Sequence, residues 1–305
     1  MIHGVLLVDK DAGGTSHDAV QRARRILREK KIGHCGTLDP AATGLLVLTV
    51  GKATRLTRFL ISAPKVYEGT IRFGIETDTY DATGEVVAEK SVEGLDEAAV
   101  REALEGFVGT QEQAAPAYSA KKVQGRKYYE LARQGEEVPT STKEITIFEL
   151  EATGGLDEDS LAFRLACTSG TYVRSLAHDL GRTLGCGAHL SSLRRLRVGP
   201  FRVEDAERLD RIEELRSAES DLGSCWVPFD EIPLPFPAVT ADAVQEQRIG
   251  HGQTILVRDL AADEGDWIRV SDRRGRLLAV GSVTERIGAG GVGVVQPRIV
   301  FAETA

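Results

Sequence analysis

Residues 33–44 read Gly33-His34-Cys35-Gly36-Thr37-Leu38-Asp39-Pro40-Ala41-Ala42-Thr43-Gly44. A single carboxylate, Asp39, lies in this glycine-bracketed loop, and we expect a strongly apolar strand directly after the loop at residues 44–50. The residue before a proline is restricted to extended backbone, so Pro40 directs the Asp39 side chain away from any regular ladder. An isolated Asp-Pro is most often a turn in which the carboxylate bonds its own backbone. The segments around the loop decide between such a turn and a functional site.

Strands and helices alternate irregularly along the first 231 residues, which favours an α+β fold over a doubly wound parallel sheet. The opening helix, which begins after residue 15, carries Val20, Ala23 and Leu27 at helical spacing. A second helix, which begins near residue 170, carries an apolar stripe that includes Val173, Leu176 and Leu180. We further expect a helix at 96–107 and strands at 4–8, 66–75, 145–152 and 161–167.

A proline-rich connector at residues 233–237 separates two parts of the chain. The residues beyond it are rich in glycine and β-branched side chains, with short strand signals near 254–258, 267–271, 277–283 and 293–301. This pattern is typical of a small β-barrel. We therefore predict two domains, at residues 1–231 and 232–305.

The composition is that of a globular protein, with 42% hydrophobic and 28% charged residues among 305. No apolar run approaches the ~20 residues that span a bilayer. The first residues lack the basic and apolar regions of a signal peptide, so we expect a cytoplasmic protein. No cysteine forms a Cys-x-x-Cys pair, and in a reducing compartment we expect four free thiols, at Cys35, Cys167, Cys186 and Cys225.

The net charge of −8 argues against a nucleic-acid partner until its distribution is considered. Residues 1–72 hold 12 Lys and Arg against 6 Asp and Glu, residues 113–134 hold 5 against 1, and residues 161–202 hold 7 against 1. Phosphate binding depends on a local basic surface rather than on the total charge. Any one cluster fits a solvated helix face. Three clusters that coincide with the unusual motifs favour a polyanionic partner.

The loop resembles the signature of the TruB family of tRNA pseudouridine synthases, whose pattern is Gly-His-x-Gly-[Thr/Ala]-Leu-Asp-Pro-x-Ala-[Thr/Ser]-Gly. The resemblance continues, in order over about 200 residues, in segments at 51–55, 65–67, 77–81, 118–122, 170–176, 185–190 and 193–195. Residues 296–301 resemble the family's small PUA-like RNA-binding domain less specifically. The chain departs from the family at Asp11, where the family commonly has proline, and before Pro116, where it often has a second proline; both changes concern loop rigidity.

This resemblance implies a mixed, largely antiparallel sheet flanked by helices, with a PUA-like β-barrel after it. It implies isomerisation of uridine 55 in the T arm of tRNA to pseudouridine, through a flipped-out base and with Asp39 as the essential carboxylate. The reaction is redox-neutral, so we expect no cofactor and no metal. We also expect no guide RNA and a monomer.

The resemblance assigns further residues around Asp39. Arg174, in the first turn of its helix where the macrodipole disfavours a cation, is expected to pair with Asp39. Tyr67 is expected to lie against the target uracil and to relay the proton lost from C5, although its strand position also fits a core aromatic residue. Tyr172 and Leu193 would line the pocket, and His34 would fill or support the gap left by the flipped nucleotide.

Several basic residues are expected to contact RNA phosphates and to make binding sensitive to salt. They are Lys10 and Lys122, together with Lys52, Arg55, Arg126, Arg194 and Arg195. A metal site at Cys186 and His189 is disfavoured because no second pair of ligands has suitable spacing. A Cys35–His34 nucleophile pair is disfavoured because side chains adjacent in sequence usually diverge.

Three alternatives remain open from the sequence. The reaction can proceed by attack of Asp39 at C1′, by attack at C6, or through a glycal after deprotonation at C2′. The chain can instead be a tRNA-binding or tRNA-folding module with secondary or no catalysis. A nucleosidase or glycosidase is a weaker hypothesis that needs a second carboxylate, for which Asp78 and Asp81 are the nearest candidates.

Overall fold

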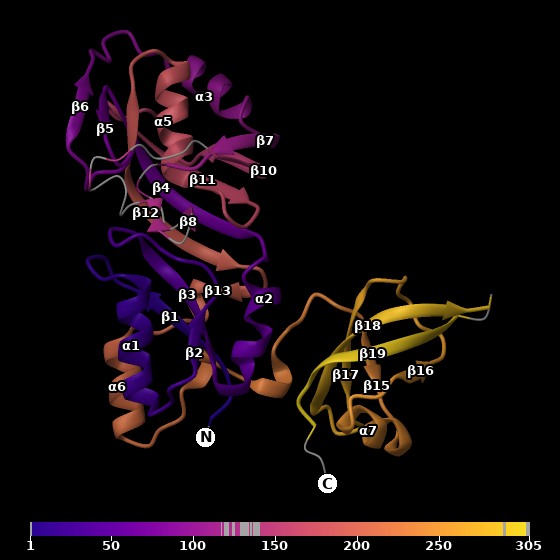
Figure 1. The fold of residues 1–305 in the computed structure, drawn as a ribbon. Coiled ribbons are helices and arrows are strands. Elements are labelled where there is room, and N and C mark those ends of the chain that lie inside the picture. The colour runs from indigo at the N-terminus through magenta and orange to yellow at the C-terminus, as the bar shows by residue number, and fades with distance from the viewer. Residues whose placement is uncertain are drawn as a thin grey trace.

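A computed structural model describes residues 2–116, 118, 122–123, 126–128, 134, 136, 141–288 and 291–302. These residues form two main sheets, one of ten strands within residues 4–228 and one of five strands within residues 238–300. The two sheets lie in separate parts of the molecule, joined by the chain around residue 230 (Figure 1). The predicted α+β fold is confirmed.

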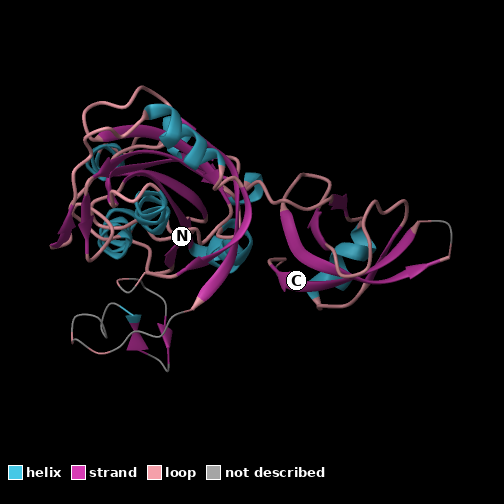
Figure 2. Ribbon diagram, turned by 90° about the horizontal axis from the view of Figure 1, so that it is seen from above, coloured by secondary structure: helices cyan, strands magenta, loops and turns pink. Residues whose placement is uncertain are grey.

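The ten-stranded sheet is antiparallel except at one junction. β3 (Thr43–Val50) and β12 (Ala188–Val198) run parallel, with Thr43 opposite Arg194 and Gly44 opposite Arg195. Each half of the sheet on either side of this junction is antiparallel. Seen from above, the sheet is strongly curved (Figure 2). The strand order is β14 (Trp226–Pro228), β1 (Gly4–Lys10), β3, β12, β4 (Lys65–Phe73), β11 (Ser160–Cys167), β10 (Thr142–Ala152) and β7 (Gly109–Ala114), with β2 (Ile32–His34) beside β3 and β13 (Phe201–Arg202) beside β12.

β12 is the central strand that the sequence did not predict. Its residues include Arg194, Arg195 and Arg197, and such charges are atypical of a strand in the middle of a sheet. Arg195 is nevertheless 1% exposed, because it lies in the interior and its charge is met by main-chain carbonyls. The Asp39 loop enters β3 beside this arginine-rich strand, so the parallel junction brings the two together.

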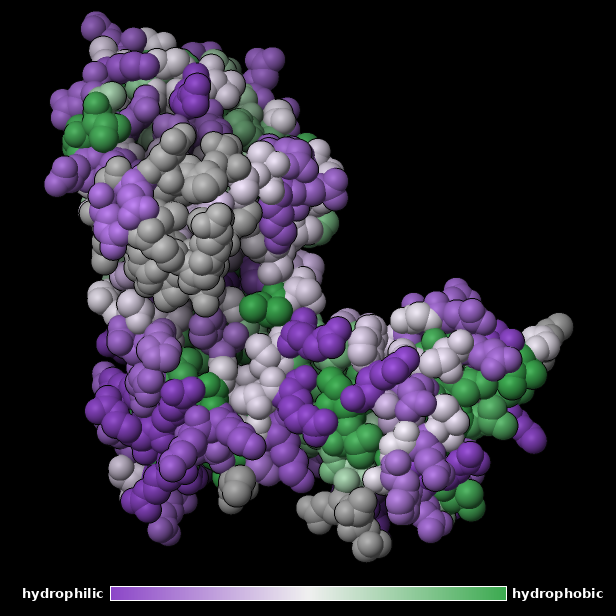
Figure 3. Space-filling view, viewed as in Figure 1, coloured by the Kyte–Doolittle hydropathy of each residue, from purple (hydrophilic) through white to green (hydrophobic). Residues whose placement is uncertain are grey.

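Helices cover the two halves of the sheet separately (Figure 1). α1 (Ser16–Leu27) begins at a capping box between Thr15 and Asp18 and lies beside α6 (Leu209–Ser217), where Arg22 pairs with Asp210 and Glu213. Hydrophilic side chains gather over α1 and α6 (Figure 3). α3 (Glu97–Glu105) and α5 (Val173–Thr183) pack on the other half. The predicted apolar stripes of α1 and α5 are buried.

Short elements connect these layers. They are η1 (Gly51–Leu56), α2 (Thr57–Leu60), η2 (Val203–Asp205), η3 (Gly223–Cys225), η4 (Phe229–Glu231), the hairpin β5 (Ile75–Thr77) with β6 (Val86–Glu89), and the pair β8 (Lys122–Val123) with β9 (Arg126–Lys127). In the described part of the chain, no helix is long and apolar enough to cross a membrane. All four cysteines are buried free thiols, as predicted.

The C-terminal sheet has the order β15 (Ala238–Thr240), β17 (Trp267–Ser271), β18 (Leu277–Ile287), β19 (Val292–Val300) and β16 (Ile255–Val257). It has its own buried core, packed with α7 (Ala243–Gly250). The sequence analysis missed α7, although Asp242 and Gln245 form the capping box that marks its start.

An aromatic contact joins the two parts. Phe59 of α2 meets Trp267 of β17 edge-on, with ring centroids 4.9 Å apart, and Arg58 lies over the Trp267 ring. Arg55 lies over Phe301 and donates to the carbonyl of Val300 at 2.7 Å. The side chain of Arg55 is thus engaged in this contact.

Candidate active site

A cavity of about 410 Å³ opens where the Asp39 loop, β4, β12 and the N-terminus of α5 meet. Its lining includes the five residues that the sequence analysis placed around the target base: Asp39, Tyr67, Tyr172, Arg174 and Leu193. They come from four segments that are far apart in the chain, so their convergence is a result of the fold. His34 and Lys10 do not line this cavity. The side chain of Lys122 lies outside the described residues.

The predicted pairing of Arg174 with Asp39 is present. Arg174 Nε lies 2.8 Å from Asp39 Oδ2, and Nη2 lies 3.4 Å from Oδ1, so the guanidinium faces the carboxylate as a fork. The side chain of Arg174 is 6% exposed, whereas that of Asp39 is 40% exposed. The arginine is therefore the buried partner, and the carboxylate reaches the cavity.

The start of α5 fixes where Arg174 lies. Tyr172 is the N-cap residue, and the amide of Gln113 bonds its main chain twice: Tyr172 N donates to Gln113 Oε1 at 2.7 Å, and Gln113 Nε2 donates to Tyr172 O at 3.0 Å. The helix dipole disfavours a cation in this first turn. Oxygen atoms compensate, because Arg174 also donates to the carbonyls of Thr79 at 2.8 Å and Tyr118 at 3.0 Å.

A second carboxylate, Asp81, also faces Arg174, with its Oδ2 3.6 Å from Arg174 Nε. Its other oxygen, Oδ1, accepts from Thr79 Oγ1 at 2.8 Å and from the amide and hydroxyl of Thr83 at 2.9 and 2.6 Å. The sequence analysis considered Asp81 only as a possible second acid. Because Oδ1 already accepts three hydrogen bonds, the geometry instead makes Asp81 a support for Arg174.

The Asp39 loop is held by two buried cations. Lys10 Nζ donates to the carbonyls of Pro40 at 3.2 Å and Ala42 at 2.8 Å. Arg195 donates to the carbonyls of Leu45 at 2.7 Å and Gly36 at 3.0 Å. Both were predicted to contact phosphates. In the structure Lys10 is 5% and Arg195 1% exposed, and their donors are directed at backbone carbonyls of the loop and of Leu45, which favours a role in holding the loop over a phosphate contact.

Lys65 is a pocket residue that the sequence analysis missed. It is 3% exposed and donates to the carbonyls of Ile61 and Ala63, both at 2.7 Å. Burial, with the nearby charge of Arg195, lowers the pKa of Lys65 to about 8. A lysine two residues before Tyr67 falls on the same strand face, so strand alternation was the available signal.

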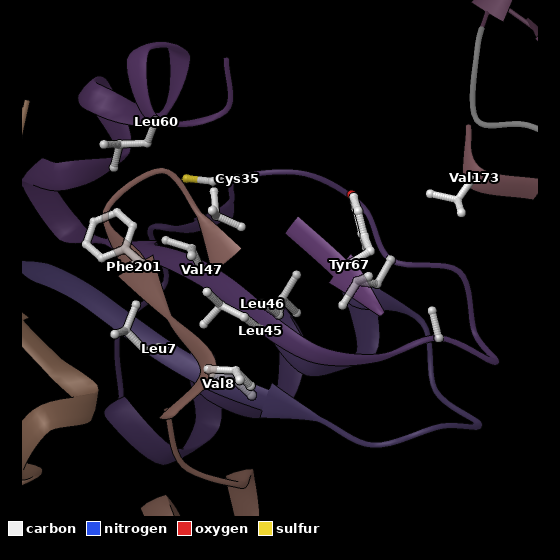
Figure 4. Close-up of a cluster of buried hydrophobic side chains, with 14 of the residues drawn as sticks. Leu7, Val8, Cys35, Leu45, Leu46, Val47, Leu60, Tyr67, Val173 and Phe201 are labelled. Carbon is white, nitrogen blue, oxygen red and sulfur yellow. The ribbon is translucent and has the colours of Figure 1, made fainter. Parts of the chain in front are cut away.

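Tyr67 is both a core residue and a wall of the cavity. In Figure 4 its ring stands at the edge of the buried cluster, with the hydroxyl turned away from Leu46. Burial raises the pKa of Tyr67, against an opposing effect of Arg195, so the phenol keeps its proton at neutral pH. The Tyr67 ring is suited to stacking and its hydroxyl to hydrogen bonding. The deprotonated form of this side chain is disfavoured at neutral pH.

Cys35 and His34, at the start of the Asp39 loop, do not form a nucleophile pair. Cys35 is fully buried, and burial raises the pKa of its thiol to about 12, which excludes a reactive thiolate near neutral pH. His34 ends β2; its Nδ1 is buried without a hydrogen-bond partner, and burial lowers its pKa. Within the described residues, no group of three His, Cys, Asp or Glu could hold a metal ion.

Three family models match the chain in succession. Residues 24–173 match the N-terminal domain of the TruB family pseudouridylate synthases, residues 174–232 match the tRNA pseudouridylate synthase B C-terminal domain, and residues 237–298 match the C-terminal domain of pseudouridine synthase II TruB. The chain belongs to the TruB family of pseudouridylate synthases.

Relatives of this TruB-family chain match over most of its length. A protein named tRNA pseudouridine synthase B from Burkholderia mallei is 44% identical over 290 residues, which cover 94% of this chain and 95% of that protein. One of the same name from Aromatoleum aromaticum is 48% identical over 255 residues, covering 84% of this chain and 82% of that protein. The pseudouridine-synthase resemblance is thereby confirmed.

A solved structure shares the whole TruB-family fold. A chain of the crystal structure of a Cbf5-Nop10-Gar1 complex is 25% identical, covers 99% of this chain and 85% of its own length, and has a TM-score of 0.75. Since the match covers 99% of this chain, the similarity of fold extends over both sheets.

Proposed function

We propose that this chain isomerises uridine 55 in the T arm of tRNA to pseudouridine, with Asp39 as the essential carboxylate. It acts without a guide RNA, as a cytoplasmic monomer, and residues 232–305 serve as its RNA-binding domain. The relatives' name supports tRNA as the substrate. The observation that carries the proposal is the half-exposed Asp39 carboxylate in a 410 Å³ cavity, held by a buried arginine and faced by a tyrosine ring.

The cavity supplies what the isomerisation requires. The N1–C1′ bond of uridine breaks, the detached uracil turns, C5 bonds to C1′, the C5 proton is released to solvent, and N1 takes up a proton from solvent. Asp39 can attack C1′ or C6, or promote the glycal path; in each case it needs a carboxylate oxygen that keeps a lone pair for the substrate. Arg174 orients this carboxylate through the fork described above.

The base must leave the RNA stack to reach Asp39, at a cost of a few kcal/mol. Stacking on an aromatic face recovers about 1–3 kcal/mol per base. Tyr67 provides such a face, and Tyr172 and Leu193 also line the cavity. In this proposal Tyr67 also relays the C5 proton, and His34 supports the RNA beside the gap. Neither Lys10 nor Arg195 is assigned to a phosphate.

Tritium release tests the proposal. A tRNA transcript labelled at uridine C5 is incubated with the parent chain and with Asp39→Asn, and a transcript with cytidine at position 55 serves as the matched substrate control. The parent is expected to release tritium from the first transcript alone, and Asp39→Asn to release none while binding tRNA as the parent does.

The same assay separates the alternative. A tRNA-folding module would bind and refold tRNA equally well with either residue at position 39 and would release no tritium. A parent chain that refolds tRNA without releasing label therefore overturns the catalytic proposal. Release from the cytidine-55 transcript would overturn the position.

A further inference from the structure

Tyr80 lies between the two residues of its turn that face Arg174. Thr79 gives its carbonyl to Arg174 at 2.8 Å, and Asp81 gives its carboxylate at 3.6 Å. The backbone of Tyr80 is left-handed, with φ +65°, a conformation that disfavours every residue with a Cβ and that glycine adopts readily. A tyrosine is therefore held here at a conformational cost, which a favourable contact of its side chain must offset.

That contact is a stack with His178. The two rings are nearly parallel, at 13°, with centroids 3.9 Å apart. His178 lies on α5, four residues after Arg174, so both side chains extend from the same face of one helix. Helix α5 thus reaches the turn at two points: Arg174 bonds Thr79 and Asp81, and His178 covers the residue between them.

His178 contacts its surroundings mainly through the face of its imidazole ring, which stacks on Tyr80, rather than through hydrogen bonds of its ring nitrogens. Its side chain is 12% exposed, and Nδ1 is buried without a hydrogen-bond partner, 3.9 Å from Glu76 Oε2. Glu76 belongs to β5, and Asp179 and Arg182 of α5 are the other charged groups that act on this ring. The main chain adds a further hold on the turn, because Leu190 N of β12 donates to Tyr80 O at 3.0 Å.

We propose that Tyr80 and His178 form an aromatic clamp that positions the 78–83 turn against Arg174 and thereby orients Asp39. Both are positioning residues: neither lines the cavity, and each acts through Arg174. The inference rests on the proposed role of Asp39. In this inference the geometry of the Asp39 carboxylate also depends on Tyr80 and His178, and Tyr80 has an unfavourable backbone conformation.

Tyr80→Gly tests the clamp most sharply. Glycine relieves the left-handed backbone and removes the ring, so the thermal midpoint is expected to stay near that of the parent or to rise. If the clamp positions Arg174, kcat for pseudouridine formation falls roughly ten- to a hundredfold while KM for tRNA stays the same, because misplacement of a reacting group by about 1 Å costs this much. If the ring only fills space, kcat is unchanged, and that result overturns the inference.

His178→Ala and His178→Phe form the matched pair on the other ring. Phenylalanine keeps a flat face for Tyr80 and is expected to retain most of the parent kcat, whereas alanine is expected to lower kcat as Tyr80→Gly does. Equal kcat for both variants would overturn the clamp. A parent chain without activity would instead refute the proposed function, so the two failures are distinguishable.

Discussion

Asp39 and Asp81 face the same guanidinium from two different loops, and they are held in opposite ways. Asp81 has a side chain that is 12% exposed, and its Oδ1 accepts three hydrogen bonds from within its own turn. Asp39 is 40% exposed, and within the described residues its carboxylate has no hydrogen-bond partner other than Arg174. Asp81 thus has one oxygen fully occupied within its turn, whereas the Asp39 carboxylate keeps lone pairs for a substrate.

The two loops reach this difference by different means. The turn at 78–83 is held by the carboxylate of Asp81 itself, through Thr79 and Thr83. The Asp39 loop is held from outside, by Lys10 and Arg195 on its main-chain carbonyls. Holding a loop through its backbone leaves its side chain free to react, and this is what distinguishes a site residue from its support.

Arg174→Met is expected to have the largest effect, because Arg174 is the partner that both carboxylates share. Its loss leaves Asp39, Asp81 and the carbonyl of Thr79 without their cation, at about 3–5 kcal/mol of unfolding free energy. Arg174→Lys keeps the charge without the fork, so it should retain more stability while turnover still falls. Urea unfolding measures the stability of each variant, and tritium release measures its turnover. Full activity in Arg174→Lys would contradict the importance of the forked contact between Arg174 and Asp39.

Lys65→Met is expected to change how stability depends on pH. The folded-state pKa of about 8 lies below the ordinary lysine pKa of 10.5, so between these pH values the unfolded chain binds more protons and stability rises with pH. The unfolding free energy of the parent therefore gains roughly 3 kcal/mol from Lys65 between pH 8 and pH 10.5. The variant has no group that titrates at this position, so the difference in unfolding free energy between parent and variant should change with pH. A difference that does not change with pH would contradict the lowered pKa of Lys65.

Lys10→Met tests the external support of the Asp39 loop. It leaves the carbonyl of Ala42 without its Lys10 donor and the carbonyl of Pro40 with only the main-chain donor Gly13 N, at about 1–3 kcal/mol of stability, and it should lower kcat. Lys30→Met, at an exposed lysine, is the control and should stay within about 0.5 kcal/mol of the parent. The slope of log affinity for tRNA against log salt concentration should be the same in Lys10→Met as in the parent. A slope reduced by about 1 would show that Lys10 contacts a phosphate after all.

Thr83→Ala tests the internal support of Asp81 and is expected to have the smallest effect. It removes one of the three hydrogen bonds to Oδ1, the one from the Thr83 hydroxyl, at about 1 kcal/mol, and the amide of Thr83 still donates. Turnover should fall by less than in Lys10→Met, because the reactive loop is untouched. A larger loss of kcat in Thr83→Ala would reverse the assignment of the two loops.

Sequence reasoning found the local elements and the reactive loop. The spacing of Val20, Ala23 and Leu27 predicted α1, and the loop motif with the first turn of α5 predicted the pair of Asp39 and Arg174. It missed β12, because the buried Arg195 of this strand is accommodated by backbone carbonyls from another part of the chain. Every residue has a backbone carbonyl, so the sequence does not show which carbonyls will accept a hydrogen bond from an arginine.

The same limit applies to the buried positions of charged side chains. Lys10 and Arg195 read as surface cations in the sequence, since lysine and arginine are almost never fully buried unless paired. Their partners are main-chain oxygens of the Asp39 loop, which only the folded chain brings within reach. The support of Arg174 by Asp81 also depends on tertiary contact, between residues 93 positions apart.

The most direct test of the account compares Asp39→Asn with Asp81→Asn under single-turnover conditions, with tRNA affinity and thermal midpoint measured on the same samples. The account predicts that Asp39→Asn abolishes pseudouridine formation and keeps tRNA binding and the midpoint near the parent values. It predicts that Asp81→Asn lowers the midpoint and slows the reaction without abolishing it. Turnover that survives in Asp39→Asn and disappears in Asp81→Asn would contradict it.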